Sequence, residues 1–256
     1  MSKNPLPSGD DIGYRASDPA PSRGKKPKIS LADFNALHRI HIPSYTSLEE
    51  LCNALTHGAG ALLSAAALAL LCVKGAASWD AWYTVSGAIY GASLVFLYLM
   101  SCLYHALPVC RGKLVFRVID HCSIFLLIAG TYTPYTLVSL RSWSPALGWT
   151  MFGVVWLAAA AGISLNAVDL MKFRKASVIA YVACGWVIVF AFRPMTAVIA
   201  APGIVLLIAG GALYTVGALI YALGKKTGVR SMHSVFHCFA LAGSVLHFFS
   251  IYLYVG

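Results

Sequence analysis

Residues 81–110, AWYTVSGAIYGASLVFLYLMSCLYHALPVC, form an apolar stretch that contains no Asp, Glu, Lys or Arg. About 17 residues in a helix are enough to cross the roughly 30 Å hydrocarbon core of a membrane. A charged residue near the bilayer centre costs at least about 2.5–3.5 kcal/mol, so charge-free runs mark the segments that can cross. The stretch therefore predicts a transmembrane helix.

Six further charge-free stretches lie between residue 51 and the end of the chain. They are continuously apolar and rich in Leu, Ala and Gly, whereas barrel strands alternate polar and apolar residues. The fifth of the seven is the shortest. The sequence predicts an all-α membrane protein, a bundle of seven transmembrane helices at Leu51–Val73, Ala81–Cys110, His121–Leu140, Ser142–Val168, Ala176–Phe192, Pro194–Gly224 and Ser231–Gly256.

The composition of the whole chain agrees with a membrane location. Of its 256 residues, 59% are hydrophobic and 11% are charged, whereas a typical soluble domain has roughly 45–50% apolar and 25% charged residues. These values exclude a soluble globular protein.

The 19 Lys and Arg residues predict the orientation in the membrane. Sixteen lie in the N-terminal tail and in the loops after the second, fourth and sixth predicted spans, and only Lys74, Arg141 and Arg193 lie on the other side. The positive-inside rule then places the N-terminus in the cytoplasm and the C-terminus outside. Anionic lipid headgroups attract such residues by about 1 kcal/mol each, so the net charge of +10 does not require a nucleic-acid partner.

The chain divides into two zones of different composition. Residues 1–46 are rich in Pro, Ser, Gly and Lys, which predicts a disordered basic cytoplasmic tail. Residues 47–256 form the predicted transmembrane domain. We place the first helix start at Ser47, because Glu50 follows three residues later at the spacing of a capping box.

Polar residues inside the spans are candidates for a functional site. In the predicted topology His247 lies about 15 Å deeper in the membrane than His237. Five other histidines and one carboxylate share the cytoplasmic level: His57, His105, His121, His233, His237 and Asp120.

The spacing of these residues indicates a metal site. His233 and His237 are four residues apart and project from one face of a helix, as in helical His-x-x-x-His zinc sites. Ser101 and His105 have the same spacing. Three histidines with an open fourth position are typical of catalytic zinc, and Asp120 needs a partner because no Lys or Arg lies inside the predicted spans. Hydrogen-bonded core histidines, and helix packing for Ser101, are the alternatives.

The sequence resembles the hemolysin III family, bacterial members of the group that includes the progestin and adipoQ (adiponectin) receptors. The resemblance covers about residues 47–256. It rests on four motifs, and it does not specify the role of the first, in residues 50–60. The motifs are Glu50-x-x-Asn53-x-x-x-His57-x-x-Gly60, Ser101-x-x-x-His105, Asp120 followed by Gly130-Thr131-Tyr132-Thr133-Pro134, and His233-Ser234-Val235-Phe236-His237 with His247 behind it.

This resemblance implies a seven-helix bundle in a bacterial inner or plasma membrane, with zinc near the cytoplasmic face. By position, His105, His233 and His237 match the direct zinc ligands of the family. Asp120 matches a carboxylate that acts through a zinc-bound water, and Ser101 matches the serine that accompanies the ligands.

Two classes of function are expected. The first is a zinc-dependent hydrolase of a lipid amide or ester, in which Asp120 orients or deprotonates water and Ser101 binds the water or the developing oxyanion. The wider group resembles enzymes that hydrolyse ceramide-type amides. The second is a non-enzymatic, zinc-stabilised membrane regulator, receptor-like protein or cytolysin. A membrane lipid is the expected substrate or ligand in the first class, and the sequence does not indicate an oligomeric state.

Overall fold

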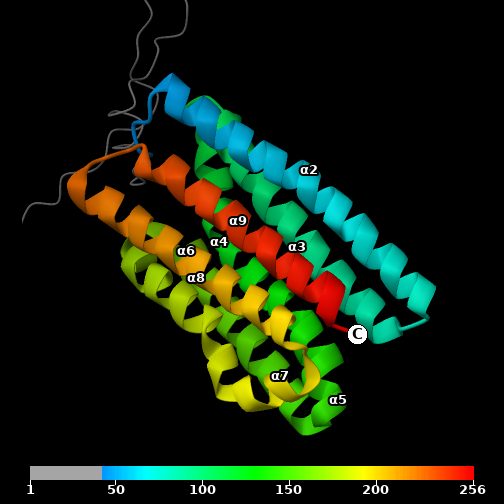
Figure 1. Cartoon of the computed structure of the whole chain (residues 1–256). Helices are drawn as coiled ribbons and strands as arrows, with labels where there is room; N and C mark the ends of the chain where they lie inside the picture. The colour runs from blue at the N-terminus through cyan, green and yellow to red at the C-terminus, as the bar shows by residue number, and fades with distance from the viewer. Residues whose placement is uncertain (1–41) are drawn as a thin grey trace, which may run out of the picture.

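The computed structural model describes residues 42–256, and every element in this part of the chain is helical. Most of the predicted tail, residues 1–41, lies outside the described residues. The long helices pack side by side in one bundle (Figure 1). The elements are α2 (Ser47–Ser78), α3 (Ala81–Ala106), α4 (Arg111–Pro134), the π-helix η1 (Tyr135–Leu140), α5 (Arg141–Trp143), α6 (Pro145–Gly185), the 3-10 helix η2 (Val187–Ala191), α7 (Phe192–Val198), α8 (Ala201–Thr227) and α9 (Met232–Tyr254).

Six helical runs within residues 42–256 are long and apolar enough to cross a membrane, whereas the sequence predicts seven. The difference arises in one continuous run, Pro145–Val198, which contains most of the predicted fourth span, all of the fifth and the start of the sixth. The helix that corresponds to the predicted sixth span, α8, begins at Ala201 and not at Pro194, because residues 192–198 form the separate short helix α7. The continuous helices therefore support six candidate membrane-spanning runs within residues 42–256, and not the predicted seven.

The chain reverses direction within α6. Asp169 has non-helical backbone angles, with φ −157° and ψ 89°. The Asn166 amide donates a hydrogen bond to the Tyr181 hydroxyl at 3.0 Å, and the Ser177 hydroxyl donates to Asn166 Oδ1 at 2.5 Å. Fifteen residues of straight helix would separate Asn166 from Tyr181 by about 22 Å. α6 is therefore two helical arms that fold back on each other at Asp169.

The packing of α2 against α3 and α9 brings the first and last helices of the described residues together. In Figure 1 the blue α2 and the red α9 run alongside α3. The Gly60 of the first sequence motif is required by this packing, because a Cβ there would lie 2.6 Å from Cδ1 of Tyr98 on α3. Residues of α2 are thereby placed next to the histidines of α3 and α9.

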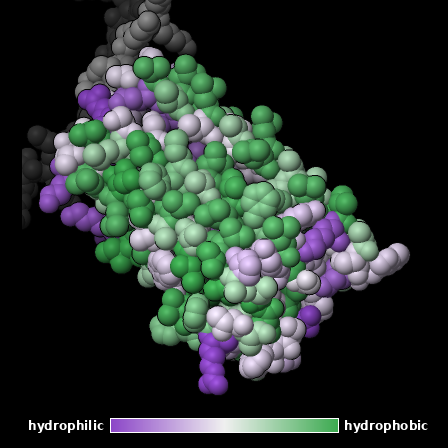
Figure 2. Space-filling model, viewed as in Figure 1, coloured by the Kyte–Doolittle hydropathy of each residue, from purple (hydrophilic) through white to green (hydrophobic). Residues whose placement is uncertain are grey.

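The outer surface of the bundle suits a lipid environment. Leu62, Val168 and Phe190 have exposed fractions of 77%, 81% and 88%. Figure 2 shows hydrophobic residues covering the flank of the bundle, with hydrophilic residues gathered toward its ends. A continuous apolar flank of this kind indicates a surface that contacts lipid.

The start of α2 differs from the predicted capping box by one residue. α2 does begin at Ser47, but Thr46 is its N-cap. The Thr46 hydroxyl accepts a hydrogen bond from the Glu49 amide at 3.2 Å, and the Thr46 amide donates to Glu49 Oε2 at 2.7 Å. Glu49 closes the box where we predicted Glu50, so Glu50 is available for contacts inside the bundle.

The last five residues of the predicted tail lie within the described part of the chain. Ile42 is buried, and the Tyr45 ring stacks on the ring of His233 with centroids 5.3 Å apart. This short segment therefore packs over the end of the bundle where α2 and α9 begin.

Candidate metal centre

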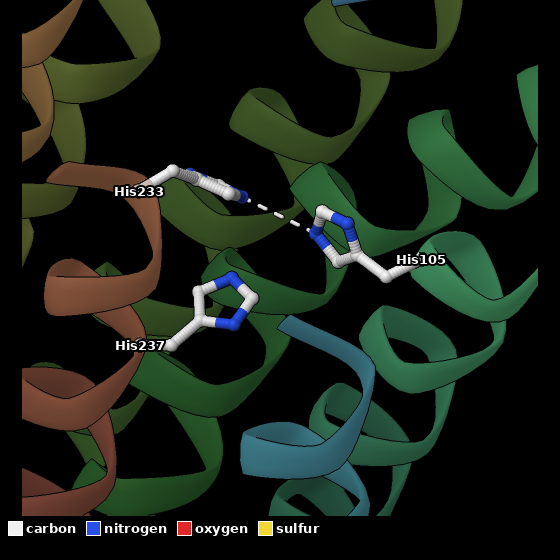
Figure 3. A group of neighbouring side chains, drawn as sticks. All are labelled: His105, His233 and His237. Atoms are coloured by element: carbon white, nitrogen blue, oxygen red, sulfur yellow. Dashed lines mark hydrogen bonds between the residues drawn. The ribbon is translucent and has the colours of Figure 1, made fainter. Parts of the chain in front are cut away.

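Three histidines meet at the end of the bundle where α2 and α9 begin. His105 lies in the last turn of α3, while His233 and His237 lie in the first two turns of α9 (Figure 3). One ring nitrogen from each lies within 4.8 Å of the other two. The prediction that these three residues come together is confirmed.

The arrangement of the three rings fits a metal ion. The Nε2 atoms of His105 and His233 are 3.2 Å apart, and two nitrogens bound to a tetrahedral zinc ion at 2.0–2.1 Å would be about 3.3 Å apart. His105 and His237 are buried, and His233 is partly exposed. The three nitrogens could therefore hold one metal ion.

Contacts to the Nδ1 atoms of His105 and His237 orient these two rings. The Nδ1 atom of His105 lies 2.6 Å from Glu50 Oε2, and the Nδ1 atom of His237 lies 3.3 Å from the Thr56 hydroxyl. Metal-binding histidines usually donate this second ring N–H to an oxygen, which fixes the tautomer and ring orientation. Both contacts leave Nε2 available to an ion.

Glu50 and Asn53, which belong to the first motif of the resemblance, contact the cluster residues or their helices, a role that the sequence analysis did not assign to them. Glu50 contacts His105, and Asn53 Oδ1 accepts a hydrogen bond from the Ser234 hydroxyl on α9 at 2.6 Å. The signal was present, since residues 50, 53 and 57 follow an i, i+3, i+7 pattern that places them on one helix face. We interpreted Glu50 as a capping residue instead.

Asp120 and Ser101 lie beside the histidine cluster. Both line the same cavity as His233 and His237, but neither belongs to the group of three ligating nitrogens. The buried Ser101 hydroxyl lies near the Asp120 carboxylate and makes no hydrogen bond of ordinary geometry to any described residue. Both side chains thus have polar atoms that face a shared space next to the cluster.

Asp120 has a basic neighbour in its own helix, although no Lys or Arg lies inside the predicted spans. α4 begins at Arg111, ten residues before the predicted third span, so Arg117 lies one turn from Asp120 on the same helix. Its guanidinium is close enough to act on the charge of the carboxylate. Asp120 also lies 3.6 Å from Nδ1 of His121.

The remaining histidines have different surroundings. His57 stacks on His237 with centroids 3.5 Å apart, and among the described residues neither of its ring nitrogens has a hydrogen-bond partner. His121 Nδ1 lies 2.9 Å from the Arg117 carbonyl, and His247 Nε2 lies 3.0 Å from the Leu207 carbonyl. These carbonyl contacts are typical of hydrogen-bonded core histidines, the alternative that we weighed for single residues.

A cavity extends from the cluster into the bundle. It encloses about 1610 Å³ of space outside the protein atoms, including the part that is open to the surroundings. Its polar end, beside the cluster, is lined by His57, Ser101, Asp120, His121, His233 and His237, and Arg174 also lines the cavity. Most of its wall consists of apolar and aromatic side chains from α4, α6 and α8, among them Ile124, Ile128, Tyr132, Val178, Tyr181 and Leu207.

Comparisons with known proteins agree with the sequence motifs. A family model described as "Haemolysin-III related" matches residues 45–248. Hemolysin-3 of Bacillus cereus is 39% identical over 207 residues, which cover 81% of this chain and 92% of that protein. The Hemolysin-3 homolog of Bacillus subtilis (strain 168) is 39% identical over 210 residues, covering 82% and 96%.

A more distant relative comes from animals. The Monocyte to macrophage differentiation factor of Homo sapiens is 26% identical over 221 residues, which cover 82% of this chain and 86% of that protein. No solved structure matches the chain.

Proposed function

The chain belongs to the haemolysin III family, and from this premise we propose that it is a zinc-dependent hydrolase of an amide or ester in a membrane lipid. The family and the six apolar helices make it a multi-pass membrane protein. The observation that carries the proposal is the group of His105, His233 and His237, with ring nitrogens within 4.8 Å of one another. This group adjoins the polar end of an apolar cavity.

Five polar residues at or beside this end of the cavity have roles in the proposed reaction. His105, His233 and His237 would hold zinc, which in a site with an open position activates water as a nucleophile and polarises a carbonyl. Asp120 accepts a proton from the attacking water. The Ser101 hydroxyl, which has no ordinary hydrogen bond within residues 42–256, donates to the carbonyl oxygen as negative charge develops on it.

The shape of the cavity supports a lipid as the substrate. Its apolar wall between α4, α6 and α8 can take an acyl chain, and its polar end lies where the carbonyl of that chain would be attacked. Ligand sites of this kind are mostly apolar with a few convergent polar groups. The proposed partner is therefore a membrane lipid, with no role for nucleic acid.

Hydrolysis by the purified protein is the direct test of this function. We expect the full chain in mild detergent to release fatty acid from a ceramide or from a diacyl phospholipid. Removal of zinc with a chelator should abolish the release, and added zinc should restore it, because water activation depends on the ion. Fatty acid is measured by mass spectrometry. Release that continues at the same rate in metal-free protein would contradict the proposal.

A non-enzymatic role is the second candidate, and the name of the Bacillus cereus relative, Hemolysin-3, favours a cytolysin. Lysis of red cells by protein that hydrolyses neither lipid would support it. A zinc-stabilised regulator or receptor-like protein would neither hydrolyse lipid nor lyse cells.

We also propose seven membrane crossings, with the N-terminus in the cytoplasm and the C-terminus outside. A straight helix as long as α6, 41 residues, would extend for about 60 Å, twice the hydrocarbon core. The reversal at Asp169 allows the run 145–198 to cross twice. The carbonyl of His121, near the cluster, accepts hydrogen bonds from Asn166 and Tyr181, so the basic residues after Asp169 lie at the same end of the bundle as the cluster. The positive-inside rule makes that end cytoplasmic.

Labelling of introduced cysteines distinguishes seven crossings from six. Ser142 and Thr196 are exposed positions, the first just before the run 145–198 and the second near its end. With seven crossings, a membrane-impermeant maleimide should label both Ser142→Cys and Thr196→Cys in intact cells, and Thr227→Cys only after lysis. Labelling of only one of the first two in intact cells would contradict the double crossing.

A further inference from the structure

We propose that Glu50 and Lys113 act as positioning residues that fix the tautomer of His105, so that its Nε2 atom is presented to the metal ion. This inference rests on the proposed zinc site. It assigns a function to two charged residues that the hydrolytic roles above do not use.

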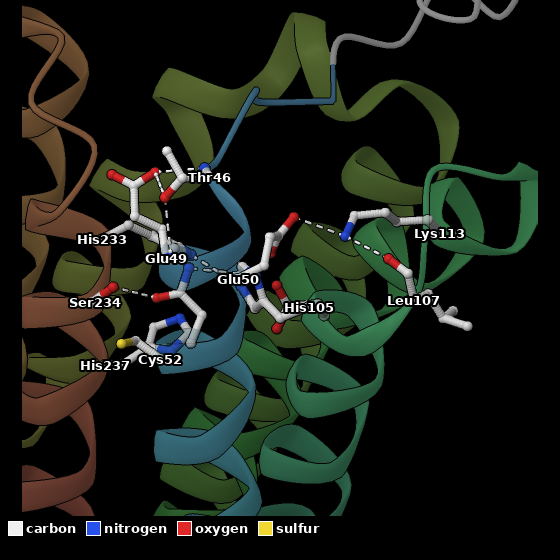
Figure 4. Close-up of polar contacts among 12 residues, drawn as sticks. Thr46, Glu49, Glu50, Cys52, His105, Leu107, Lys113, His233, Ser234 and His237 are labelled. Atoms are coloured by element: carbon white, nitrogen blue, oxygen red, sulfur yellow. Dashed lines mark hydrogen bonds and ion pairs between the residues drawn. The ribbon is translucent and has the colours of Figure 1, made fainter. Parts of the chain in front are cut away.

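The three side chains form a continuous chain of short contacts between three helices. The Glu50 carboxylate on α2 places Oε2 at 2.6 Å from His105 Nδ1 on α3, and Oε1 at 2.8 Å from Lys113 Nζ on α4 (Figure 4). Lys113 Nζ also donates a hydrogen bond to the Leu107 carbonyl at 2.8 Å. Each carboxylate oxygen therefore has its own partner.

Burial makes these contacts unlike an ordinary surface ion pair. The side chains of His105 and Lys113 have exposed fractions of 0% and 3%, and that of Glu50 has 20%. Exposed ion pairs contribute little to stability, whereas partners of metal-binding histidines at a buried site typically change metal affinity 10–100-fold. The position of the pair beside a candidate ligand thus indicates a role in metal binding.

The chemistry of the two partners determines which nitrogen of His105 carries the proton. An ionised carboxylate can only accept hydrogen bonds, so His105 Nδ1 must donate to Glu50. The neutral ring then has a lone pair on Nε2, the atom that lies 3.2 Å from His233 Nε2. The Asn53 amide nitrogen is 3.5 Å from the same Nδ1, too far to compete with the carboxylate at 2.6 Å.

Lys113 makes this arrangement selective for a carboxylate. An ammonium group is only a donor, so in a Glu50→Gln variant it would attract the amide oxygen. The amide nitrogen would then face His105 Nδ1 as a donor and would favour the tautomer that has its proton on Nε2. That tautomer cannot bind a metal ion through Nε2. Removing Lys113 as well would allow the amide to turn and offer its oxygen to His105.

Zinc dissociation constants of four variants test the proposal. Each is measured on the purified full chain in mild detergent, by competition with a chromophoric zinc chelator. We expect Glu50→Gln to bind zinc about 10–100-fold more weakly than the wild type. The double variant Glu50→Gln with Lys113→Met should bind zinc more tightly than Glu50→Gln alone. If Glu50 and Lys113 only stabilised the fold, the effects of the two substitutions would add, and the double variant would bind zinc more weakly than Glu50→Gln.

Two single variants serve as controls. Glu49→Gln removes the same charge one residue earlier, and Gln can still close the capping box, so its zinc affinity should equal that of the wild type. Lys113→Met alone removes the hydrogen bond to the Leu107 carbonyl, as the double variant does. Its zinc affinity therefore shows how much of the change in the double variant comes from this loss. Glu50→Gln with unchanged affinity, or a double variant no better than Glu50→Gln, would overturn this inference alone. Wild-type protein without zinc affinity would overturn the proposed metal site and this inference with it.

Discussion

Substitution of His237 by alanine should remove zinc from the protein and abolish the release of fatty acid. Loss of an outer partner of a metal ligand already lowers affinity by about 10–100-fold. Loss of one of three ligands should therefore weaken zinc binding by more than about 100-fold. The zinc content of the purified variant, measured by mass spectrometry of the metal, should fall from about one ion per chain to a small fraction of that.

His247→Ala is the matched control for this substitution. His247 is also a buried histidine of α9, but its Nε2 contacts the Leu207 carbonyl and not the cluster. The two variants lose the same side chain from the same helix, so a general loss of packing would affect both. Equal zinc contents in the two variants would show that the cluster does not hold the ion.

Asp120→Asn should abolish hydrolysis and leave zinc in place. The amide of Asn cannot accept the proton of the attacking water, and the loss of a general base typically lowers the rate by about 10²–10⁴-fold. His105, His233 and His237 are unchanged in this variant, so its zinc content should equal that of the wild type. The measurements are kcat/KM for fatty acid release and the zinc content of the same preparation.

The control for Asp120→Asn is Asp169→Asn at the turn within α6. Asp169 Oδ1 accepts a hydrogen bond from the Lys172 amide at 2.9 Å, and Asn supports this local contact nearly as well. This variant should keep the wild-type rate. If Asp120→Asn also kept that rate, Asp120 would not be the base. If it lost its zinc, Asp120 would be a direct ligand.

Much of the fold follows from the distribution of charge in the sequence. The start of the predicted second span at Ala81 agrees with α3, and the predicted seventh span differs from α9 by one or two residues at each end. These ends are sharp because charged or turn-forming residues border the apolar runs. In the run 145–198 the predicted fourth span ends at Val168, beside the reversal at Asp169. The end of α7 at Val198 was not predicted, because no charged residue marks a break within residues 194–224.

The candidate ligands could be predicted because they depend on two regular quantities, helix periodicity and depth in the membrane. His233 and His237 share a face by spacing alone, and His105 reaches them because α3 ends at their level. Depth alone did not distinguish His121, whose Nδ1 contacts the carbonyl of Arg117. Which way a ring faces depends on helix rotation, and that is set by packing.

The sequence did not predict that Glu50 and Lys113 form a chain of contacts with His105. Glu50 and Glu49 are adjacent acidic residues at a helix start, and both spacings suit a capping box. Only the three-dimensional structure shows that Thr46 uses Glu49, which leaves Glu50 to join His105 and Lys113. The i, i+3, i+7 spacing of residues 50, 53 and 57 indicates a shared helix face, but the contact joins residues 55 positions apart in the sequence, so this spacing does not identify His105 as the partner of Glu50.

The most direct test of the central claim is metal analysis of the full-length wild-type protein, combined with an anomalous-scattering map recorded at the zinc absorption edge. Our account predicts about one zinc ion per chain, with a single anomalous peak among the Nε2 atoms of His105, His233 and His237. Protein that contains no zinc after purification with zinc present, or a peak away from these three histidines, would contradict it.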